Sequence, residues 1–308
     1  MRDSSIPTVS DKVSVEHPAR VTGEIRPPWH KRIKRWIKPY YLRGKVHIAQ
    51  TFYGYGIDKF DAALGRVGIG MGDALMVHSS FAKTSGFRGR PAEFIECLLS
   101  RLGDDGHLLM LSMAYGGSSE RYVSGDPLFD VCTSPSALGV MSELFRRRPD
   151  VLRSLNPLHP VLAHGPLAAW LTIDHEKIPR SCGAGSPFER LLTLHGKFLF
   201  IDAPFGALTF MHFVEDLLRD SLPVALYGET PATVRIRDRE GGEHSVRQYY
   251  FSAAARDRRN FAKISTRLEQ GGHFRRTRVG RTELLCVDAA PIVVCAQALC
   301  ASGEGFYR

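Results

Sequence analysis

Hydrophobic and polar positions follow two periods along residues 58–308, one typical of helices and one typical of strands. The helical period predicts helices over 59–67, 91–102, 136–147, 209–218, 253–268 and 291–300. Short apolar or alternating runs predict strands over 74–77, 107–113, 197–202, 233–238, 245–251 and 283–287. Pro91 stands at a favoured first helical position, and Gly241-Gly242 marks a hairpin turn. Strands and helices alternate, so we predict an α/β fold, and the late hairpin predicts a mixed sheet.

The composition is that of an ordinary globular protein. The chain has 308 residues, of which 44% are hydrophobic and 24% charged, and this excludes collagenous, disordered and coiled-coil proteins. No apolar run reaches the roughly 20 residues that a membrane-spanning helix needs. The first residues have no apolar stretch behind a basic start, so no signal peptide is expected. We therefore predict a cytoplasmic protein.

The cysteines and histidines give no sign of a metal site. Six cysteines lie in apolar surroundings without a Cys-x-x-Cys pair, which predicts reduced, buried thiols and neither a disulfide framework nor a zinc site. His159, His164 and His175 show no spacing typical of metal ligands. No metal is expected.

The net charge of +9 is concentrated in one short segment. Residues 26–57 contain eight basic residues and no acidic one, whereas 58–308 are nearly neutral. The charge therefore predicts an N-terminal extension over 1–57, polar and then basic and aromatic, followed by an α/β domain over 58–308.

Aromatic and aliphatic residues recur at helical spacing between the basic residues of the extension, at Trp29, Ile33, Trp36 and Ile37. One interpretation is an arm that packs on the body of the protein or on a second subunit. Another is a helix over residues 26–45 that lies on an anionic membrane surface, giving a peripheral contact. A nucleic-acid arm would carry similar charge, but the chain has no recognisable nucleic-acid module, so no nucleic-acid partner is expected. The oligomeric state is left open.

A candidate anion site follows the first predicted strand. The strand leads directly into His78-Ser79-Ser80, with turn glycines before the next helix. Small hydroxyl residues and backbone N–H groups at such a turn suit phosphate oxygens, although an ordinary polar turn would look the same. The glycine patterns of nucleotide triphosphatases and dinucleotide-binding proteins are absent from the sequence, so neither class is supported.

A candidate general base lies in the helix predicted over 209–218. Thr209 suits the N-cap position, which places His212 in the first turn and Glu215 on the same face. The positive end of the helix disfavours an imidazolium and helps to keep His212 neutral. A neutral histidine beside a carboxylate can accept a proton; the alternative is a structural histidine with a solvated glutamate.

Short motifs in a fixed order connect these features. In chain order they lie at 64–68, 72–80, 106–110, 126–130, 133–139, 143–147, 153–157, 185–187, 209–215, 279–280 and 287–290. Over roughly residues 60–300 this ordered set resembles the aminoglycoside 3-N-acetyltransferase family, also called the antibiotic N-acetyltransferases. The resemblance implies a central mixed β-sheet flanked by helices, with a smaller α/β lobe.

The resemblance also implies an activity: transfer of an acetyl group from acetyl-CoA to a primary amine of an aminoglycoside or amino-sugar-like acceptor. It implies that His212 is the general base and that a carboxylate orients it. The residues that it implies for the CoA site are His78, Ser79, Ser80, Arg153, Ser154 and Thr209. An O-acyltransferase, or a relative that only binds CoA or a partner, remains as an alternative.

The chain departs from the family pattern where the carboxylate partner is expected. Asn156 and Pro160 stand where His and Ser are frequent, and the stretch after the hairpin has no acidic residue before Asp257. Glu243, Asp257 and Glu215 are the candidates, and we expect Glu215 and Asp257 to act with His212. Aminoglycosides are polycations that favour acidic sites. Because few acidic clusters are evident, we hypothesise an amine carried by an anionic or membrane-associated molecule.

Overall fold

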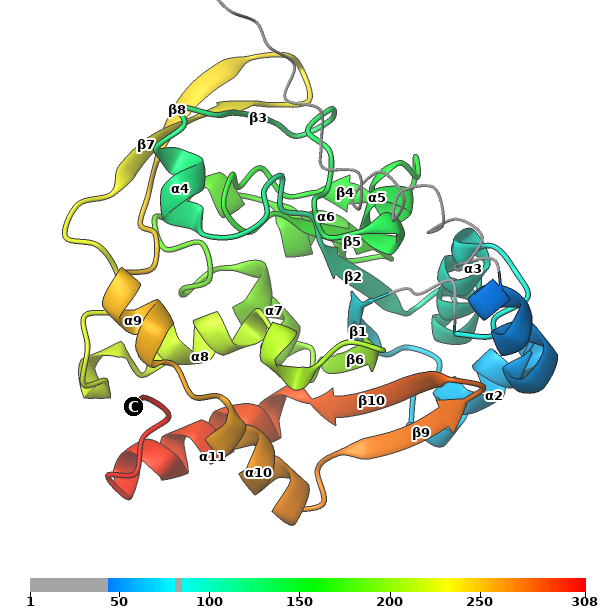
Figure 1. The fold of residues 1–308 in the computed structure, drawn as a ribbon. Coiled ribbons are helices and arrows are strands. Elements are labelled where there is room, and N and C mark those ends of the chain that lie inside the picture. The colour runs from blue at the N-terminus through cyan, green and yellow to red at the C-terminus, as the bar shows by residue number, and fades with distance from the viewer. Residues whose placement is uncertain (1–43, 81–84) are drawn as a thin grey trace, which may run out of the picture. The chain divides into compact units, whose positions relative to one another are not determined.

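The computed structural model of the chain describes residues 44–80 and 85–308. A compact unit extends from Gly44 to Arg308 (Figure 1). Residues 44–53 form a helix in this unit, although the charge boundary assigned them to the extension. The aromatic and basic pattern predicted to contact a membrane lies outside the described residues, except for 44–45.

The helices and strands include the predicted ones in their predicted order, together with further elements that the sequence pattern does not predict. The α-helices are α2 (Ile57–Arg66), α3 (Pro91–Leu102), α4 (Ser119–Val123), α5 (Val140–Arg146), α6 (Ala168–Thr172), α7 (Pro187–Thr193), α8 (Phe210–Leu217), α9 (Ala253–Arg258), α10 (Ala262–Gln270) and α11 (Ala289–Ala301). The strands are β1 (Ala74–Ser79), β2 (His107–Leu111), β3 (Leu128–Asp130), β4 (Leu152–Arg153), β5 (Val161–His164), β6 (Lys197–Ile201), β7 (Ala232–Arg237), β8 (Glu243–Gln248), β9 (Arg275–Val279) and β10 (Thr282–Asp288).

Most predicted elements are confirmed, and α3 coincides with its predicted range because Pro91 begins it and Gly103 ends it at a φ of 68°. Two helix predictions need correction. The helix predicted from residue 136 begins only at Val140, after Gly139, whose φ of 106° is incompatible with a helix. The helix predicted over 253–268 is divided into α9 and α10, with residues 259–261 between them.

The central sheet is mixed, as predicted, but for a different reason. Among the described residues it has seven strands in the order β4-β5-β2-β1-β6-β10-β9. β1 pairs in parallel with β2 and β6, whereas β5 and β10 pair antiparallel with their neighbours. The β7–β8 hairpin is confirmed but lies outside this sheet, because β7 pairs with β3 in a separate three-stranded sheet. With α4, that sheet forms the smaller lobe.

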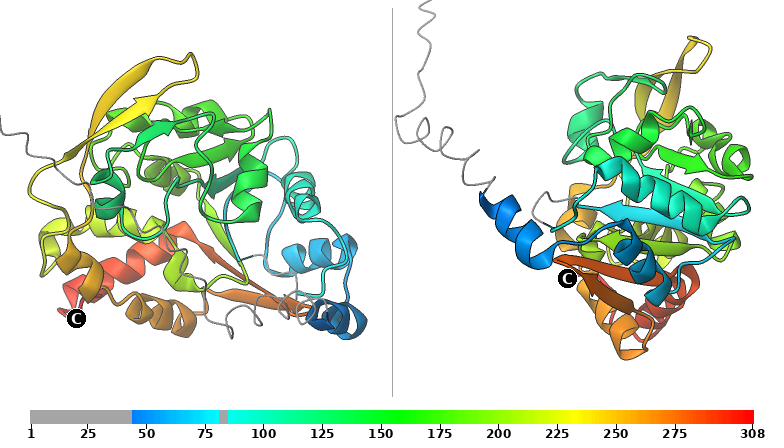
Figure 2. Two further views of the ribbon diagram at one scale, coloured as in Figure 1. Left: turned by 45° about the horizontal axis from the view of Figure 1, so that its top comes forward. Right: turned by 90° about the vertical axis from the view of Figure 1, so that its right-hand side faces the viewer.

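Helices cover both faces of the central sheet (Figure 2). Because side chains alternate along a strand, Leu75 and Val77 join one apolar core, whereas Met76 joins the other. The first core is completed by α2, α3 and α5, and the second by α6, α7, α8, α10 and α11. The sheet is thereby fixed on both faces, and the carboxyl ends of β1, β2 and β6 are held at one edge.

The described residues contain no helix long and apolar enough to cross a membrane. All six cysteines are free thiols. The prediction of burial is correct for Cys97, Cys182 and Cys286 but wrong for Cys132, which is exposed in the loop after β3. Within the described part of the chain, no group of three or more His, Cys, Asp and Glu side chains could hold a metal ion.

Candidate active site

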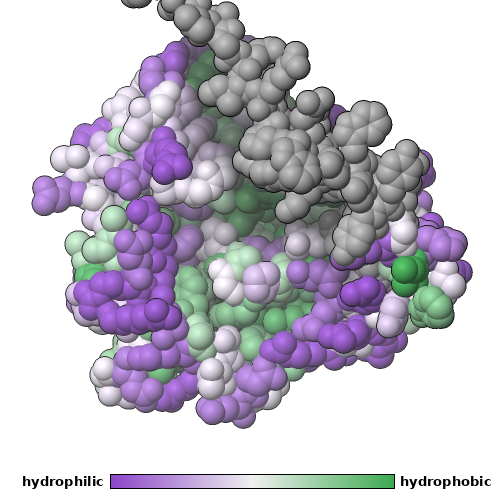
Figure 3. All heavy atoms as spheres, in the orientation of Figure 1, coloured by the Kyte–Doolittle hydropathy of each residue, from purple (hydrophilic) through white to green (hydrophobic). Residues whose placement is uncertain are grey.

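A cavity of about 240 Å³ opens at the carboxyl edge of the central sheet. Its walls come from the ends of β1 and β2, from the turn after β6 and from the start of α5. The chain leaves β1 toward β2 on one side and returns as β6 on the other, so the cavity lies where the strand order reverses. Ligands of open α/β sheets bind at such positions. In Figure 3 apolar residues gather toward the centre of the visible face, with hydrophilic residues along its lower margin.

Two polar groups of the predicted CoA site line this cavity without a hydrogen-bond partner among the described residues: His78 Nε2 and Ser79 Oγ. The His78 ring stacks on Phe200 at 5.2 Å, and burial lowers the pKa of His78 to about 4. His78 is therefore a neutral group at physiological pH. Buried polar atoms in proteins are nearly always paired, so these atoms fit a ligand that supplies the missing partners.

Ser80 and Thr209 also line the cavity. Thr209 stands at the N-cap position of α8, but its side chain makes no capping hydrogen bond, so that part of the prediction is wrong. The reason is that its φ and ψ, −68° and −24°, are already helical, whereas a capping residue is extended. Thr209 therefore lines the cavity at the point where α8 begins.

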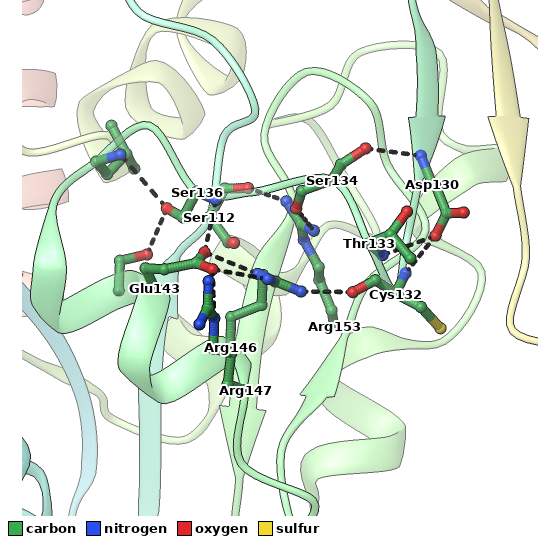
Figure 4. Close-up of polar contacts among 12 residues, drawn as sticks. Ser112, Asp130, Cys132, Thr133, Ser134, Ser136, Glu143, Arg146, Arg147 and Arg153 are labelled. Carbon is green, nitrogen blue, oxygen red and sulfur yellow. Dashed lines mark hydrogen bonds and ion pairs between the residues drawn. The ribbon is translucent and has the colours of Figure 1, made fainter.

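The opposite wall is a loop that polar contacts hold in place (Figure 4). Glu143 accepts hydrogen bonds from Ser136 N at 2.9 Å and from Arg146 Nε at 2.8 Å. Arg146 also donates to the carbonyl oxygen of Cys132. The arginine side chains hold the pKa of Glu143 at about 2, so the carboxylate is ionised. This network connects the 130–139 loop to α5, which carries cavity-lining residues.

Arg153 and Ser154 do not line the cavity. Arg153 is buried and donates to the carbonyl oxygens of Ser134 at 2.6 Å, Val131 at 3.4 Å and Ser112 (Figure 4). The hydroxyl of Ser154 accepts a hydrogen bond from Val161 N and shares another with His175 Nδ1, both at 2.8 Å. Both side chains therefore hold the loop and the strands, and their assignment to the CoA site stays a prediction.

His212 and Glu215 meet one turn apart on α8. His212 Nδ1 lies 2.8 Å from Glu215 Oε2. An ionised carboxylate can only accept, so the proton of this hydrogen bond is on Nδ1 and Nε2 is left with a free lone pair. The i, i+3 spacing predicts this contact, but Glu215 is fully buried rather than solvated.

Two residues distant in sequence complete the surroundings of Glu215. Arg259 Nε donates to Glu215 Oε1 at 2.6 Å, and the hydroxyl of Tyr307 donates to the same oxygen. Burial raises the pKa of Glu215, but the contacts with His212 and Arg259 outweigh it and hold that pKa below its ordinary value. Glu215 is therefore a buried, ionised carboxylate whose two oxygens have different partners.

Burial lowers the pKa of His212, and this effect exceeds the opposing effect of Glu215. Arg259 lowers it further by charge repulsion. The neutral form that the sequence predicts is supported, although burial rather than the helix terminus is the main cause. The ring packs against Phe251 at 4.4 Å and lies 5.9 Å from the ring of His159, measured between centroids.

The other carboxylate candidates lie elsewhere. Asp257 is exposed on α9 and pairs with Arg256 at 3.7 Å, and Glu243 pairs with Arg237 on the hairpin. In the part of the chain that the structure describes, Glu215 is the carboxylate that contacts His212. Sequence reasoning missed Arg259 and Tyr307, because no local pattern connects them to α8.

Comparisons with known proteins concern the family and the fold of the chain. A sequence model of the family described as aminoglycoside 3-N-acetyltransferase matches residues 76–301. The chain is 30% identical over 171 residues to aminoglycoside N(3)-acetyltransferase III of Serratia marcescens, covering 52% of this chain and 63% of that protein. It is 35% identical over 151 residues to aminoglycoside N(3)-acetyltransferase IV of a Salmonella species, covering 48% and 54%. The matched regions thus span about half to two thirds of these relatives.

Solved structures have the same fold. Aminoglycoside acetyltransferase AAC(3)-IVa, as a mutant in complex with apramycin, matches with a TM-score of 0.62 and 26% identity, over 82% of this chain and 94% of that one. AAC-IIIb in a binary complex with CoASH matches with a TM-score of 0.68 and 24% identity, over 82% and 98%. The second comparison concerns the fold alone. With the family model spanning most of the described unit, the chain belongs to the aminoglycoside 3-N-acetyltransferase family.

Proposed function

We propose that this protein transfers an acetyl group from acetyl-CoA to a primary amine, with His212 as the general base. The observation that carries the proposal is the contact between His212 Nδ1 and Glu215, in a helix that begins at the cavity wall. The curated relatives are named as N(3)-acetyltransferases, and the proposal extends that activity to this chain.

The geometry suits proton removal from an amine. A protonated amine cannot attack a thioester, so a base must take its proton. His212 is neutral because of burial, its Nδ1–H donates to Glu215, and Nε2 is free to accept the proton. Acetyl-CoA supplies the thioester, and the thiol of CoA is the leaving group.

The cavity residues fit a CoA thioester. His78 Nε2 and Ser79 Oγ are buried polar atoms that need partners, and the amide and phosphate groups of CoA can provide them. The remaining walls are largely apolar, with Met110, Leu138 and Met141 among them. These residues would hold the pantetheine part of CoA, while the backbone at Ser79 and Ser80 would serve polar groups.

We further propose that the acceptor is an amino sugar or another amine with low positive charge. The two acidic residues near the C-terminal end of α8 are already paired: Glu215 with Arg259 at 2.6 Å and Asp216 with Arg180 at 2.8 Å. A polycation is held best by carboxylates that have no cationic partner. The panel of acceptors should therefore contain aminoglycosides, neutral amino sugars and phosphorylated amino sugars.

The test measures thiol release from acetyl-CoA with this panel, for the wild type and for His212→Gln. His212→Gln should lower the rate by about 100-fold or more, since a general base contributes about 10² to 10⁴. His244→Gln is the matched control, because this histidine is exposed on the hairpin. Thiol release that persists in His212→Gln would reject the general base. CoA binding without turnover of any amine or alcohol would instead favour a protein that only binds CoA. Turnover of alcohols alone would favour an O-acyltransferase.

We also propose a peripheral contact with an anionic membrane through the basic segment of the chain. The described helix over 44–53 has exposed apolar side chains, with 53% of Ile48 and 75% of Phe52 accessible. Basic residues beside apolar ones favour an anionic surface. The full chain should sediment with vesicles that contain phosphatidylserine and not with purely zwitterionic vesicles, and Phe52→Ser should weaken sedimentation. Equal recovery with both kinds of vesicle would reject this contact.

A further inference from the structure

We propose that Arg259 and Tyr307 are positioning residues that commit Glu215 Oε2 to His212 by occupying Glu215 Oε1. Arg259 Nε lies 2.6 Å from Oε1, and the Tyr307 hydroxyl donates to the same oxygen. His212 Nδ1 lies 2.8 Å from Oε2. The inference rests on the proposed function, since it concerns how the general base of that reaction is oriented.

The fold delivers these two side chains together. Residues 305–308 run alongside residues 258–260: Arg308 N donates to Arg258 O at 2.7 Å, and Asn260 N donates to Phe306 O at 2.8 Å. Between these contacts, Arg259 and Tyr307 form an antiparallel bridge. The break between α9 and α10, which the sequence pattern does not predict, is where this pairing occurs.

The segment is anchored firmly enough to fix a side chain. Phe306 is fully buried in the second core, and Tyr307 is only 6% exposed. The guanidinium of Arg259 lies 4.6 Å from the centroid of the Phe251 ring, and Phe251 also packs against His212. Arg259 therefore contacts both the carboxylate and the ring that define the position of His212.

The carboxylate needs these donors to remain ionised. Glu215 is fully buried, and a buried charge without partners changes its protonation instead. One oxygen is held by a cation and a hydroxyl, and the other has His212 Nδ1 as its one hydrogen-bond partner among residues 44–80 and 85–308. The result is one tautomer of the imidazole, with Nε2 unprotonated and available to the acceptor amine.

The proposal has a signature in the titration of the histidine. The charged or titratable groups around His212 and Glu215 are Arg259, Tyr307 and His159, with Asp216 and Cys182 nearby. Arg259 repels a proton that is added anywhere in the His212–Glu215 pair. Its removal should therefore raise the pKa at which the pair takes up a proton, and the acid limb of the rate profile should move to higher pH.

The experiment compares Arg259→Gln and Tyr307→Phe with the wild type in the full chain. Two readouts are used: kcat, KM and their pH profiles, and the ¹⁵N NMR titration of the His212 ring. Arg259→Gln should lower kcat by about 10-fold or more, as expected for a charged hydrogen bond, with KM for acetyl-CoA within about twofold. The pKa of His212 should rise by about half a unit to one unit. Tyr307→Phe should change both quantities in the same direction and by less.

Arg256→Gln and Tyr250→Phe are the matched controls, because the Tyr250 ring lies beside Gly228 whereas Tyr307 donates to Glu215. Arg256 lies on α9 but pairs with Glu120 and Asp257 rather than with Glu215. Both controls should leave the titration of His212 unchanged. The proposal is overturned if Arg259→Gln and Tyr307→Phe lower the melting temperature but leave the pKa and tautomer of His212 as in the wild type, because the contacts are then only structural. If the NMR titration shifts as expected while no amine is acetylated by the wild type, the proposed function fails and the positioning stands.

Discussion

Replacing Arg153 by methionine tests whether this arginine holds the fold or binds CoA. Methionine keeps an unbranched apolar side chain near Phe129, whose ring lies 4.6 Å from the guanidinium carbon, and removes the charge and all donors. Two buried carbonyl oxygens, of Ser112 and Val131, and the part-buried carbonyl oxygen of Ser134 lose their donor.

The expected loss of stability follows from these contacts. Each carbonyl left unpaired costs about 2 kcal/mol, and the cation–π contact contributes about 1 kcal/mol. Burial lowers the pKa of Arg153 to about 10 from 12.5, so removing the charge returns about 3 kcal/mol. We therefore expect Arg153→Met to lower the free energy of unfolding by about 4 kcal/mol. At about 2 to 4 °C per kcal/mol, the melting temperature should fall by about 8 to 16 °C.

The assay combines urea unfolding, followed by circular dichroism, with calorimetric titration of CoA under conditions where the variant is folded. Arg147→Met is the control: Arg147 is 69% exposed and pairs with Glu143 on the surface of α5, so its loss should change stability by less than about 1 kcal/mol. The reasoning is refuted if Arg153→Met unfolds at the wild-type urea concentration but binds CoA at least ten times more weakly. The guanidinium would then be a CoA ligand and not a donor to the loop.

Three further predictions concern Glu143 beside the cavity, Ser79 in its wall and the turn at Gly86. The pKa of Glu143 is about 2 in the folded protein, so its ionised form stabilises the fold above pH 4.5, and about 3 kcal/mol of the free energy of unfolding should be lost as the pH falls from 4.5 to 2. Unfolding titrations of Glu143→Gln should lack this part of the pH dependence, and a pH profile identical to that of the wild type would contradict the prediction. Ser79→Ala removes a hydroxyl without a partner among the described residues and should weaken CoA binding by about threefold to tenfold without loss of stability, whereas unchanged affinity by calorimetry would place CoA elsewhere. Gly86→Ala adds a Cβ 2.3 Å from Tyr53 O at a φ of 95° and should lower the free energy of unfolding by about 2 kcal/mol or more; a wild-type melting temperature would count against it.

Local sequence signals account for the elements that were predicted well. Pro91 and Gly103 define α3 by their own conformational preferences, and Thr209, His212 and Glu215 reveal a helical face through their spacing. By contrast, β4 and β5 have only two and four residues. Runs so short carry too little periodicity to be recognised, and their pairing depends on the rest of the sheet.

The remaining parts of the site depend on contacts between distant segments. The sequence pattern of residues 253–268 is that of one continuous helix, so nothing local predicts the break between α9 and α10. This break places Arg259 against Glu215, which lies 44 residues away in the sequence. Tyr307 is 92 residues from its partner. The family resemblance assigns Arg153 and Ser154 to the CoA site, and only the tertiary structure shows that the Arg153 guanidinium donates to backbone carbonyl oxygens.

The order of strands in the central sheet has a consequence for synthesis of the protein. β1 ends at Ser79, but its parallel neighbour β6 begins only at Lys197. At about 5 to 20 residues per second, a ribosome needs roughly 6 to 24 seconds to translate the intervening segment. During that time one edge of an apolar strand, with Leu75, Met76 and Val77 at its centre, has no partner. We therefore expect ribosome-associated chaperones to bind this edge in the nascent chain, and co-expression of such chaperones should raise the yield of folded protein.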